Sequence, residues 1–353
     1  MATVSLPVTF HGVGVEQLNA PLTRVQRTVS SLAADELLVR VRHSSINPID
    51  HKTVTVNMFH APLPIIAGID FSGTVVAVGG PPHKSQEAID VGSEVFGCRM
   101  GGSCHAEYAV VKREFIALRG AIPSEEAGVY GGVLFTAVDG VVVSGEISRR
   151  KGQWIYVAGA AGGVGHIAVQ LAKLYGMRVI GSAGKPATLE LLRSLHVDIV
   201  IDYSKQDVVK EVLAATGGKG ADVVYDPTFS LSSFAQSAAC VASGGVWVKL
   251  GLDKNQPGAE AYSKVAEGRG ATALTPTIGR WIAEFGGEEP YMHQQSRMTQ
   301  ALRDAVGWYE SGALRPHINR TIECEPVAMQ QAFDDLGKLD GGGKIAVSIP
   351  DSI

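Results

Sequence analysis

The sequence lacks long apolar segments and a strong excess of either charge. No apolar run in its 353 residues approaches the roughly 20 needed to span a bilayer, so we expect no membrane partner. Lys and Arg together number 31 and Asp and Glu number 35, which gives a formal net charge of −4 at pH 7. This balance offers no electrostatic reason to expect a nucleic acid as partner.

Cysteine is scarce and scattered. The four residues are Cys98, Cys104, Cys240 and Cys324. None forms a C-x-x-C pair, so neither a disulfide framework nor a structural zinc site is indicated. Cys98 and Cys104 with His105 could suggest a metal cluster, but their spacing fits no usual ligand set. We interpret the cysteines as small buried residues and predict no metal site.

The first residues carry no mark of a targeting segment. Residues 1–7 contain neither a basic stretch ahead of an apolar core nor an Arg-rich amphipathic presequence, so we expect a cytoplasmic protein. Apolar residues make up 45% of the chain and charged residues 19%, which is ordinary for an α/β enzyme. The length allows two domains, each with its own core.

A glycine-rich turn is the most informative stretch that is present. An apolar strand at 154–158 precedes it, and residues 166–173 follow with helical spacing of apolar side chains. Such a turn permits close approach of the backbone to a pyrophosphate, which the helix N-terminus attracts. The residues predicted to bind the cofactor here are Gly159, Ala161, Gly162, Gly163, Val164 and Gly165. Because the spacing is G-x-x-G-x-x-G rather than G-x-G-x-x-G, a tight turn without a ligand is the alternative.

The strands after this turn indicate which dinucleotide is bound. An NAD site usually places an acid about 20 residues past the glycines, whereas the first acid here is Glu190, inside the next predicted helix. Ser182 and Lys185 stand there instead, and a hydroxyl and an ammonium would bind a 2′-phosphate. Tyr203, at the end of the following strand, could approach the same phosphate. We therefore predict NADPH as cofactor; a solvated surface lysine is the alternative for Lys185.

The pattern of the chain changes twice. Residues 1 to about 130 read as strands between Gly- and Pro-rich turns, and residues 131–285 alternate strands with helices, as in a doubly wound parallel sheet. The tail leaves that alternation, so we expect it to return to the first domain. Its predicted elements are helices at 296–310 and 326–339 and a strand at 344–349.

Several segments together resemble the medium-chain dehydrogenase/reductase superfamily, over nearly the whole chain. The matching segments are 45–50, 66–73, 91–97, 160–165 and 168–173. The last two are similar to the quinone oxidoreductase branch. The resemblance implies an α/β protein with a GroES-like β-rich substrate domain, residues 1–130 and 286–353, and a Rossmann NADPH-binding domain, residues 131–285.

The ligands of the catalytic zinc in the superfamily's alcohol dehydrogenases are not matched. The early ligand cysteine is replaced by the Asn47-Pro48 segment, and the Gly-His-Glu motif reads Gly68-Ile69-Asp70. Without a Lewis acid to stabilise an alkoxide, the resemblance implies hydride transfer to an acceptor that is already electrophilic.

The resemblance also implies roles for residues around the acceptor. Asn47 matches an Asn before Pro that contacts substrate and nicotinamide, and its amide could polarise a carbonyl. An ordinary turn Asn is the alternative. Lys52 completes an Asn-Pro-x-Asp-x-Lys pattern similar to alkenal and enone reductases, and could stabilise an enolate or donate a proton. A surface Lys at a strand end, paired with Asp50, is the alternative. Three further residues match nicotinamide contacts: Thr136, Leu250 and Gly251. A helix residue hydrogen-bonded locally is the alternative for Thr136.

We therefore predict an NADPH-dependent, zinc-independent reductase of quinones or α,β-unsaturated carbonyls. An enoyl-thioester reductase is the alternative within the oxidoreductases. A crystallin-like protein that binds NADPH with little or no turnover is the alternative from another class. The resemblance also implies a homodimer.

Overall fold

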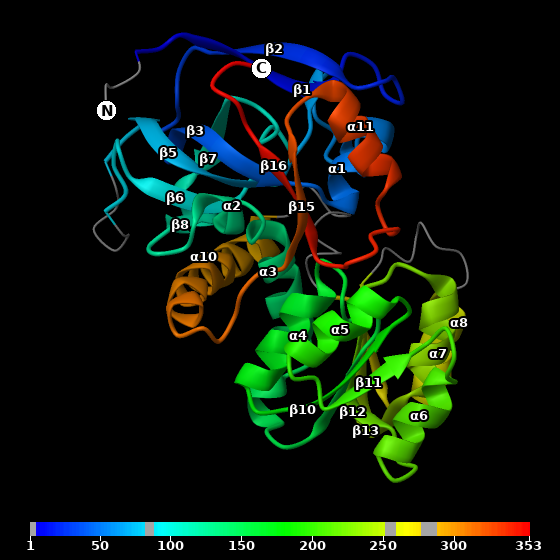
Figure 1. Ribbon diagram of the computed structural model, residues 1–353. Helices are drawn as coiled ribbons and strands as arrows, with labels where there is room; N and C mark the ends of the chain where they lie inside the picture. The colour runs from blue at the N-terminus through cyan, green and yellow to red at the C-terminus, as the bar shows by residue number, and fades with distance from the viewer. Residues whose placement is uncertain (1–4, 82–87, 251–258, 277–287) are drawn as a thin grey trace. The chain divides into compact units, whose positions relative to one another are not determined.

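The computed structural model describes residues 5–81, 88–250, 259–276 and 288–353 (Figure 1). The chain forms two compact units. Unit 1 comprises Met1–Gly132, Gly287–Leu339 and Lys344–Ile353, and unit 2 comprises Val133–Gly286 and Asp340–Gly343. The substrate and cofactor roles of the two domains, and the boundaries at 130 and 285, stay predictions.

Unit 1 is built on a seven-stranded sheet with the order β15-β16-β3-β5-β6-β8, in which β7 also pairs with β3. Its strands are β3 (Glu36–Ser45), β5 (Asp70–Val78), β6 (Glu94–Cys98), β7 (Tyr108–Lys112), β8 (Ile116–Leu118), β15 (Ile318–Glu323) and β16 (Lys344–Ser348). A smaller sheet joins β2 (Thr23–Val29), β1 (Val8–Val15) and β4 (Ile65–Ile66). Because β16 pairs antiparallel with β3, a strand from the tail lies beside one from the start of the chain (Figure 1).

The helices of unit 1 come from both ends of the chain. They are α1 (Pro48–Val56), α2 (Ser124–Ala127), α10 (Glu288–Glu310) and α11 (Pro326–Asp334). The helix predicted from 296 starts earlier, at Glu288, since the residues ahead of 296 show no apolar periodicity. The helix predicted to reach 339 ends at Asp334, ahead of Gly337, whose φ of +78° is incompatible with a right-handed helix.

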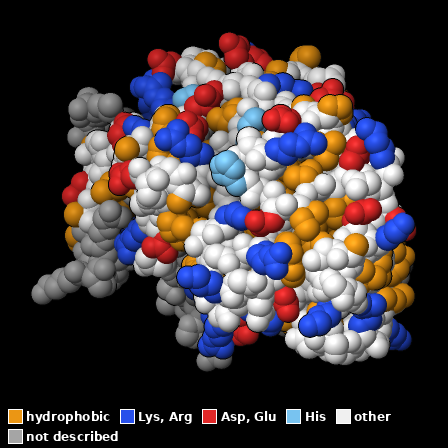
Figure 2. Space-filling view, turned by 60° about the horizontal axis from the view of Figure 1, so that its bottom comes forward, with side chains coloured by type: hydrophobic (Ala, Val, Ile, Leu, Met, Phe, Trp, Pro, Cys, Tyr) orange, Lys and Arg blue, Asp and Glu red, His pale blue; other side chains and the backbone are white. Residues whose placement is uncertain are grey.

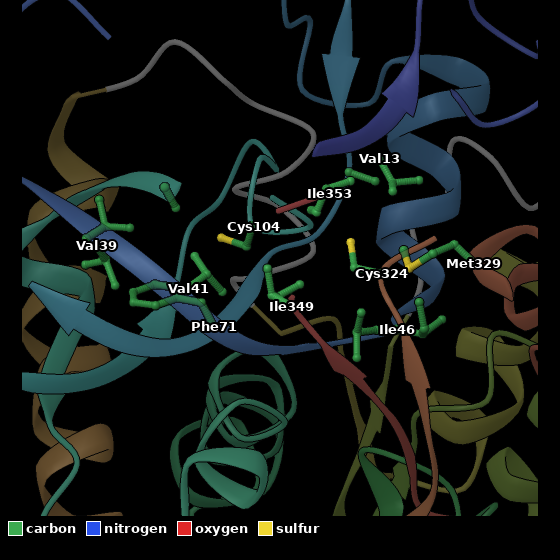
Figure 3. Packing of buried hydrophobic residues seen from close by; sticks show 14 of the residues in the cluster. Val13, Val39, Val41, Ile46, Phe71, Cys104, Cys324, Met329, Ile349 and Ile353 are labelled. Carbon is green, nitrogen blue, oxygen red and sulfur yellow. The ribbon is translucent and has the colours of Figure 1, made fainter. Parts of the chain in front are cut away.

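Apolar side chains from β3, β5, α11 and the C-terminal segment share one core in unit 1. Figure 3 shows Val39, Phe71, Met329 and Ile349 in this cluster. Cys104 and Cys324 are part of it. All four cysteines are buried and free, as predicted.

Unit 2 holds a six-stranded parallel sheet with the order β11-β10-β9-β12-β13-β14. Its strands are β9 (Trp154–Val157), β10 (Arg178–Ala183), β11 (Ile199–Asp202), β12 (Ala221–Asp226), β13 (Val241–Lys249) and β14 (Thr272–Leu274). Its helices are α4 (Gly165–Leu174), α5 (Pro186–Ser194), α6 (Val208–Ala215), α7 (Leu231–Ala239) and α8 (Ala259–Gly268). The strand order reverses between β9 and β12, so the predicted doubly wound sheet is confirmed. In such sheets ligands bind beyond the carboxyl ends of the strands at this reversal.

No helix in the described ranges is both long and apolar enough to cross a membrane. Figure 2 shows Lys and Arg side chains interspersed with Asp and Glu side chains over the visible face. This mixture fits the small net charge of the chain.

Candidate active site

Two of the four glycines in the turn of unit 2, Gly159 and Gly165, are required by the fold, whereas Gly162 is not. Gly159 has a φ of +56°, and a Cβ on Gly165 would lie 2.3 Å from the Gly159 carbonyl oxygen. A Cβ on Gly162 would meet only that same oxygen, at 3.3 Å, among the described atoms within 4 Å. The space beside Gly162 is therefore open, at the N-terminal end of α4, and a pyrophosphate fits such a cradle.

Lys185 and Tyr203 lie next to each other beyond the ends of two neighbouring strands. Strands β10 and β11 pair in parallel through Ala183 and Asp202, so the segments that follow them run side by side. Lys185 is the N-cap of α5. The Tyr203 ring lies against Gly184, where a Cβ would come within 2.3 Å of the ring. The arrangement offers a cation and an exposed phenol on one surface, which can bind a phosphate.

Ser182 lies on the same strand but does not face that surface. Its side chain is buried, and its hydroxyl is 3.0 Å from the hydroxyl of Tyr156. This hydrogen bond occupies the group that the sequence analysis assigned to a 2′-phosphate. The roles of Ser182, Lys185 and Tyr203 at a 2′-phosphate stay predictions.

A segment from the far end of the chain runs along the glycine turn. The Gly343 N–H donates to the Ala161 carbonyl at 2.8 Å, and Gly343 bridges Gly162. A Cβ on Gly342 would come within 2.3 Å of the Ala161 oxygen, so the close approach requires glycine there. The Asp340 carboxylate at the start of the segment is 2.7 Å from Lys185 Nζ. This contact was not predicted, although the run of three glycines after Asp340 indicates a segment that can approach another backbone closely.

The predicted nicotinamide contacts lie at two places in unit 2. Thr136 is near the end of α3 (Gly131–Ala137), and its carbonyl accepts from the Tyr225 hydroxyl at 3.2 Å. Leu250 directly follows β13 and is buried, with its N–H donating to the Asp226 carbonyl at 2.8 Å. Gly251 lies outside the described residues.

In unit 1, Asn47 caps α1 and is held by a network of buried polar groups. Its N–H donates to the Asp50 carboxylate at 2.7 Å, three residues into the helix, and Pro48 occupies the first helical position. Its side-chain amide donates to Asp70 at 2.8 Å and accepts from the ammonium of Lys344. The Asn47 side chain is therefore fixed in one orientation.

Asp70 and Lys344 form the centre of this network. Asp70 accepts from the Ser45 hydroxyl and from the Gly132 N–H, each at 2.5 Å. Lys344 donates to the Ile46 carbonyl at 2.9 Å and lies 3.7 Å from Asp70. Both side chains are almost fully buried. Neither residue was predicted to belong to the site, although each is the only charged residue of its strand and stands at its first position.

Burial governs the protonation of the groups around Asn47. Desolvation and the neighbouring Asp70 carboxylate raise the pKa of Asp50 to about 7, and one Asp50 oxygen has no hydrogen-bond partner among the described residues. Burial lowers the pKa of His105 to about 4, so the ring is neutral at physiological pH. Burial also lowers the pKa of Lys344, opposed by the attraction of Asp70 and Asp50. Asp50 thus exchanges its proton near neutral pH.

Lys52 lies inside α1 and not at a strand end. It is half-buried, and this burial lowers the pKa of its ammonium. A lowered pKa makes a lysine a better proton donor near neutral pH.

Neither the acid in the segment that replaces the superfamily's Gly-His-Glu motif nor the two cysteines Cys98 and Cys104 fit a zinc site. Both oxygens of Asp70 accept hydrogen bonds from the protein. Burial raises the pKa of the Cys98 and Cys104 thiols, whereas zinc binds thiolates. In the part of the chain that the structure describes, no three His, Cys, Asp or Glu side chains are placed to hold a metal.

Two family models match the chain, one in the first part and one in the second. Residues 33–143 match the alcohol dehydrogenase GroES-like domain, and residues 163–272 match the zinc-binding dehydrogenase domain. The 2-methylene-furan-3-one reductase of Solanum lycopersicum is 32% identical over 332 residues, which are 90% of this chain and 73% of that protein. The chain belongs to the medium-chain dehydrogenase/reductase family.

Two further members of this family are similar over nearly the full chain. The trans-enoyl reductase pgmF of Aspergillus terreus is 29% identical over 354 residues, which cover 95% of this chain and 91% of that protein. The crystal structure of an alcohol dehydrogenase superfamily protein from Novosphingobium aromaticivorans superposes with a TM-score of 0.79 at 29% identity. It covers 97% of this chain and all of that protein. Family membership confirms the GroES-like and Rossmann fold and supports an oxidoreductase with a nucleotide cofactor.

Proposed function

We propose that this protein is an NADPH-dependent reductase of α,β-unsaturated carbonyls and quinones that works without zinc. The observation that carries the proposal is in unit 2, where Lys185 and Tyr203 follow the neighbouring strands β10 and β11 and lie close together. A cation there favours a phosphorylated ribose, whereas an acid would favour the free hydroxyls of NADH. The open cradle beside Gly162 would hold the pyrophosphate.

The buried network of unit 1 prepares Asn47 as a donor. The Lys344 ammonium bonds the Asn47 carbonyl oxygen, which polarises the amide and strengthens its N–H groups as donors. The Asn47 amide nitrogen donates to Asp70 at 2.8 Å and to the Ser45 hydroxyl at a weak 3.4 Å. Exchange of the weaker contact would let this amide donate to the carbonyl oxygen of an acceptor.

A nicotinamide, when bound, would supply a hydride for the electron-poor carbon of the acceptor. The residues of the chain then stabilise the negative charge that moves to the acceptor oxygen. Asn47 donates a hydrogen bond to that oxygen, and the Lys52 ammonium favours the enolate by its charge. A proton from Lys52 or from solvent completes the reduction.

The name of the tomato relative, a reductase of a 2-methylene-furanone, supports an enone as acceptor. The test is NADPH oxidation with a 2-alkenal, a 2-methylene ketone and 9,10-phenanthrenequinone, measured in parallel with elemental analysis for zinc. We expect turnover with at least one of these acceptors and less than stoichiometric zinc. NADPH binding without turnover of any acceptor would favour a crystallin-like binding protein, and absence of NADPH binding would refute the proposal.

An enoyl-thioester reductase is the second candidate, because the trans-enoyl reductase of Aspergillus terreus is similar over 95% of the chain. Crotonyl-CoA in the same assay distinguishes the two. A kcat/KM for crotonyl-CoA at least tenfold above that for the free enals and quinones would replace the first candidate with the second.

A cytoplasmic homodimer that binds no nucleic acid completes the proposal. The small net negative charge supports the last point. Sedimentation of the purified protein tests the dimer, and cell fractionation tests the location.

A further inference from the structure

The lysine proposed to bind the 2′-phosphate already faces an anion of the chain itself. Lys185 Nζ is 2.7 Å from the Asp340 carboxylate. The two side chains are 42% and 94% exposed, so the pair is hydrated and weak. A carboxylate in this place mimics part of the charge of a phosphate.

Asp340 is kept near Lys185 by its own segment. Three residues further on, the Gly343 N–H donates a hydrogen bond to the Ala161 carbonyl, and Gly343 forms an isolated parallel β-bridge with Gly162 of the glycine turn. Asp340–Gly343 belongs to unit 2, whereas the residues on either side of it belong to unit 1. The tether holds the carboxylate at a high local concentration near Lys185, which favours the pair beyond its intrinsic strength.

The other acid near this surface is neutralised by its neighbours. The Asp202 carboxylate accepts from the N–H and hydroxyl of Ser204 and lies 3.3 Å from Lys205. The ion pair of Lys185 that the structure shows is with Asp340.

We propose that Asp340 is a specificity-determining residue that competes with the 2′-phosphate of the cofactor for Lys185. This inference rests on the proposed function. Without nucleotide the carboxylate pairs with Lys185, and NADPH must displace it because a phosphate and a carboxylate repel each other at one cation. NADH places no phosphate there and leaves the pair intact. Asp340 thereby weakens the binding of NADPH but not of NADH. It reduces the preference of the protein for NADPH over NADH that Lys185 creates.

The test is equilibrium binding of NADPH, NADH, 2′,5′-ADP and 5′-AMP to the full chain, measured by calorimetry. Asp340→Asn should tighten NADPH and 2′,5′-ADP by roughly threefold to tenfold, as removal of a weak competing ion pair permits. NADH and 5′-AMP should bind within about twofold of wild type, because neither carries the 2′-phosphate.

Asp351→Asn is the matched control, since it makes the same change of charge at an exposed acid that pairs with Arg40 and Arg42 in unit 1. It should leave all four affinities unchanged. In a Lys185→Met background Asp340→Asn should increase the affinity for NADPH by a smaller factor, because there is no Lys185 ammonium to free from its ion pair.

Three results would overturn the role of Asp340: weaker NADPH binding by Asp340→Asn, equal tightening of NADPH and NADH, or no change. If neither wild type nor Asp340→Asn binds NADPH, the proposed function itself fails. The two failures are thus separate outcomes of one experiment.

Discussion

The two units each hold a Lys–Asp ion pair, and the pairs differ in their access to water. In unit 1, Lys344 and Asp70 are 3.7 Å apart with 3% and 0% of their side chains exposed. In unit 2, Lys185 and Asp340 are 2.7 Å apart but 42% and 94% exposed. The longer contact is the harder one to break, because loss of either partner leaves an unpaired charge in the core. The shorter one can be exchanged for a ligand because water stabilises each partner alone.

This difference matches the tasks that we propose for the two pairs. The buried pair orients an amide, which has to be in place before an acceptor arrives. The exposed pair positions the Lys185 ammonium for a phosphate that binds reversibly. Asp340 and Lys344 are close in the chain, so one short segment contributes to both.

The comparison is tested most strongly by removing each lysine. Lys344→Met should lower the free energy of unfolding by about 3–5 kcal/mol, because it leaves Asp70 and the Asn47 carbonyl without their cation. Lys185→Met should change it by less than about 1 kcal/mol. Urea titrations followed by circular dichroism measure both. Equal losses of unfolding free energy in the two variants would mean that burial does not make one ion pair contribute more to stability than the other.

Reversing the exposed charge tests whether Lys185 serves a ligand. Lys185→Glu should weaken NADPH by roughly 30- to 100-fold, since a charge-assisted contact to phosphate is replaced by repulsion. NADH should bind within about twofold of wild type. Calorimetric titration with both nucleotides decides the matter, and an equal loss for both would remove Lys185 from the 2′-phosphate site.

The raised pKa of Asp50 gives the buried network a dependence on pH. Its pKa is about 7 in the fold, above the ordinary 3.8, so the folded protein holds a proton that the unfolded chain releases. Stability is therefore highest at low pH with respect to this group and falls as the pH rises from about 4 to about 7. The free energy of unfolding of Asp50→Asn, relative to that of wild type, should therefore rise by up to about 2 kcal/mol when the pH is raised from 5 to 8.

Urea unfolding of both proteins at the two pH values measures this gain. The contribution of His105 is common to wild type and variant and cancels in the difference. A difference that does not change with pH would show that Asp50 is ionised throughout this range.

The smallest expected effect is at the partly exposed Lys52. Lys52→Ala should lower turnover about tenfold at saturating NADPH, because solvent can still protonate the product while the charge near the enolate is lost. Affinity for NADPH should stay the same. Steady-state kinetics of Lys52→Ala and Lys52→Arg separate the two roles, since Arg keeps the charge but is a poor proton donor. Unchanged turnover in both would make Lys52 a surface residue.

Much of the fold could be predicted because its signals are local. The strand before Gly159 and the helix after Gly165 follow from apolar periodicity, and the alternation beyond residue 131 predicted a parallel sheet. The end of α11 was placed five residues too late, since the positive φ of Gly337 is invisible in the pattern of apolar residues. Ser182 was chosen by its distance in sequence from the glycines, and its hydrogen bond to the Tyr156 hydroxyl, 26 positions away, could not be read from that spacing.

The sequence by itself determined the family, through several segments that resemble it, and the glycine turn with its flanking strand and helix, because apolar periodicity and the freedom of glycine act over a few residues. Only the tertiary structure decided which charges meet. Asp340 reaches Lys185 across 155 positions, and Lys344 reaches Asn47 across 297. Such pairings depend on how strands and loops are brought together, and burial then sets whether a pair is fixed or can be exchanged for a ligand.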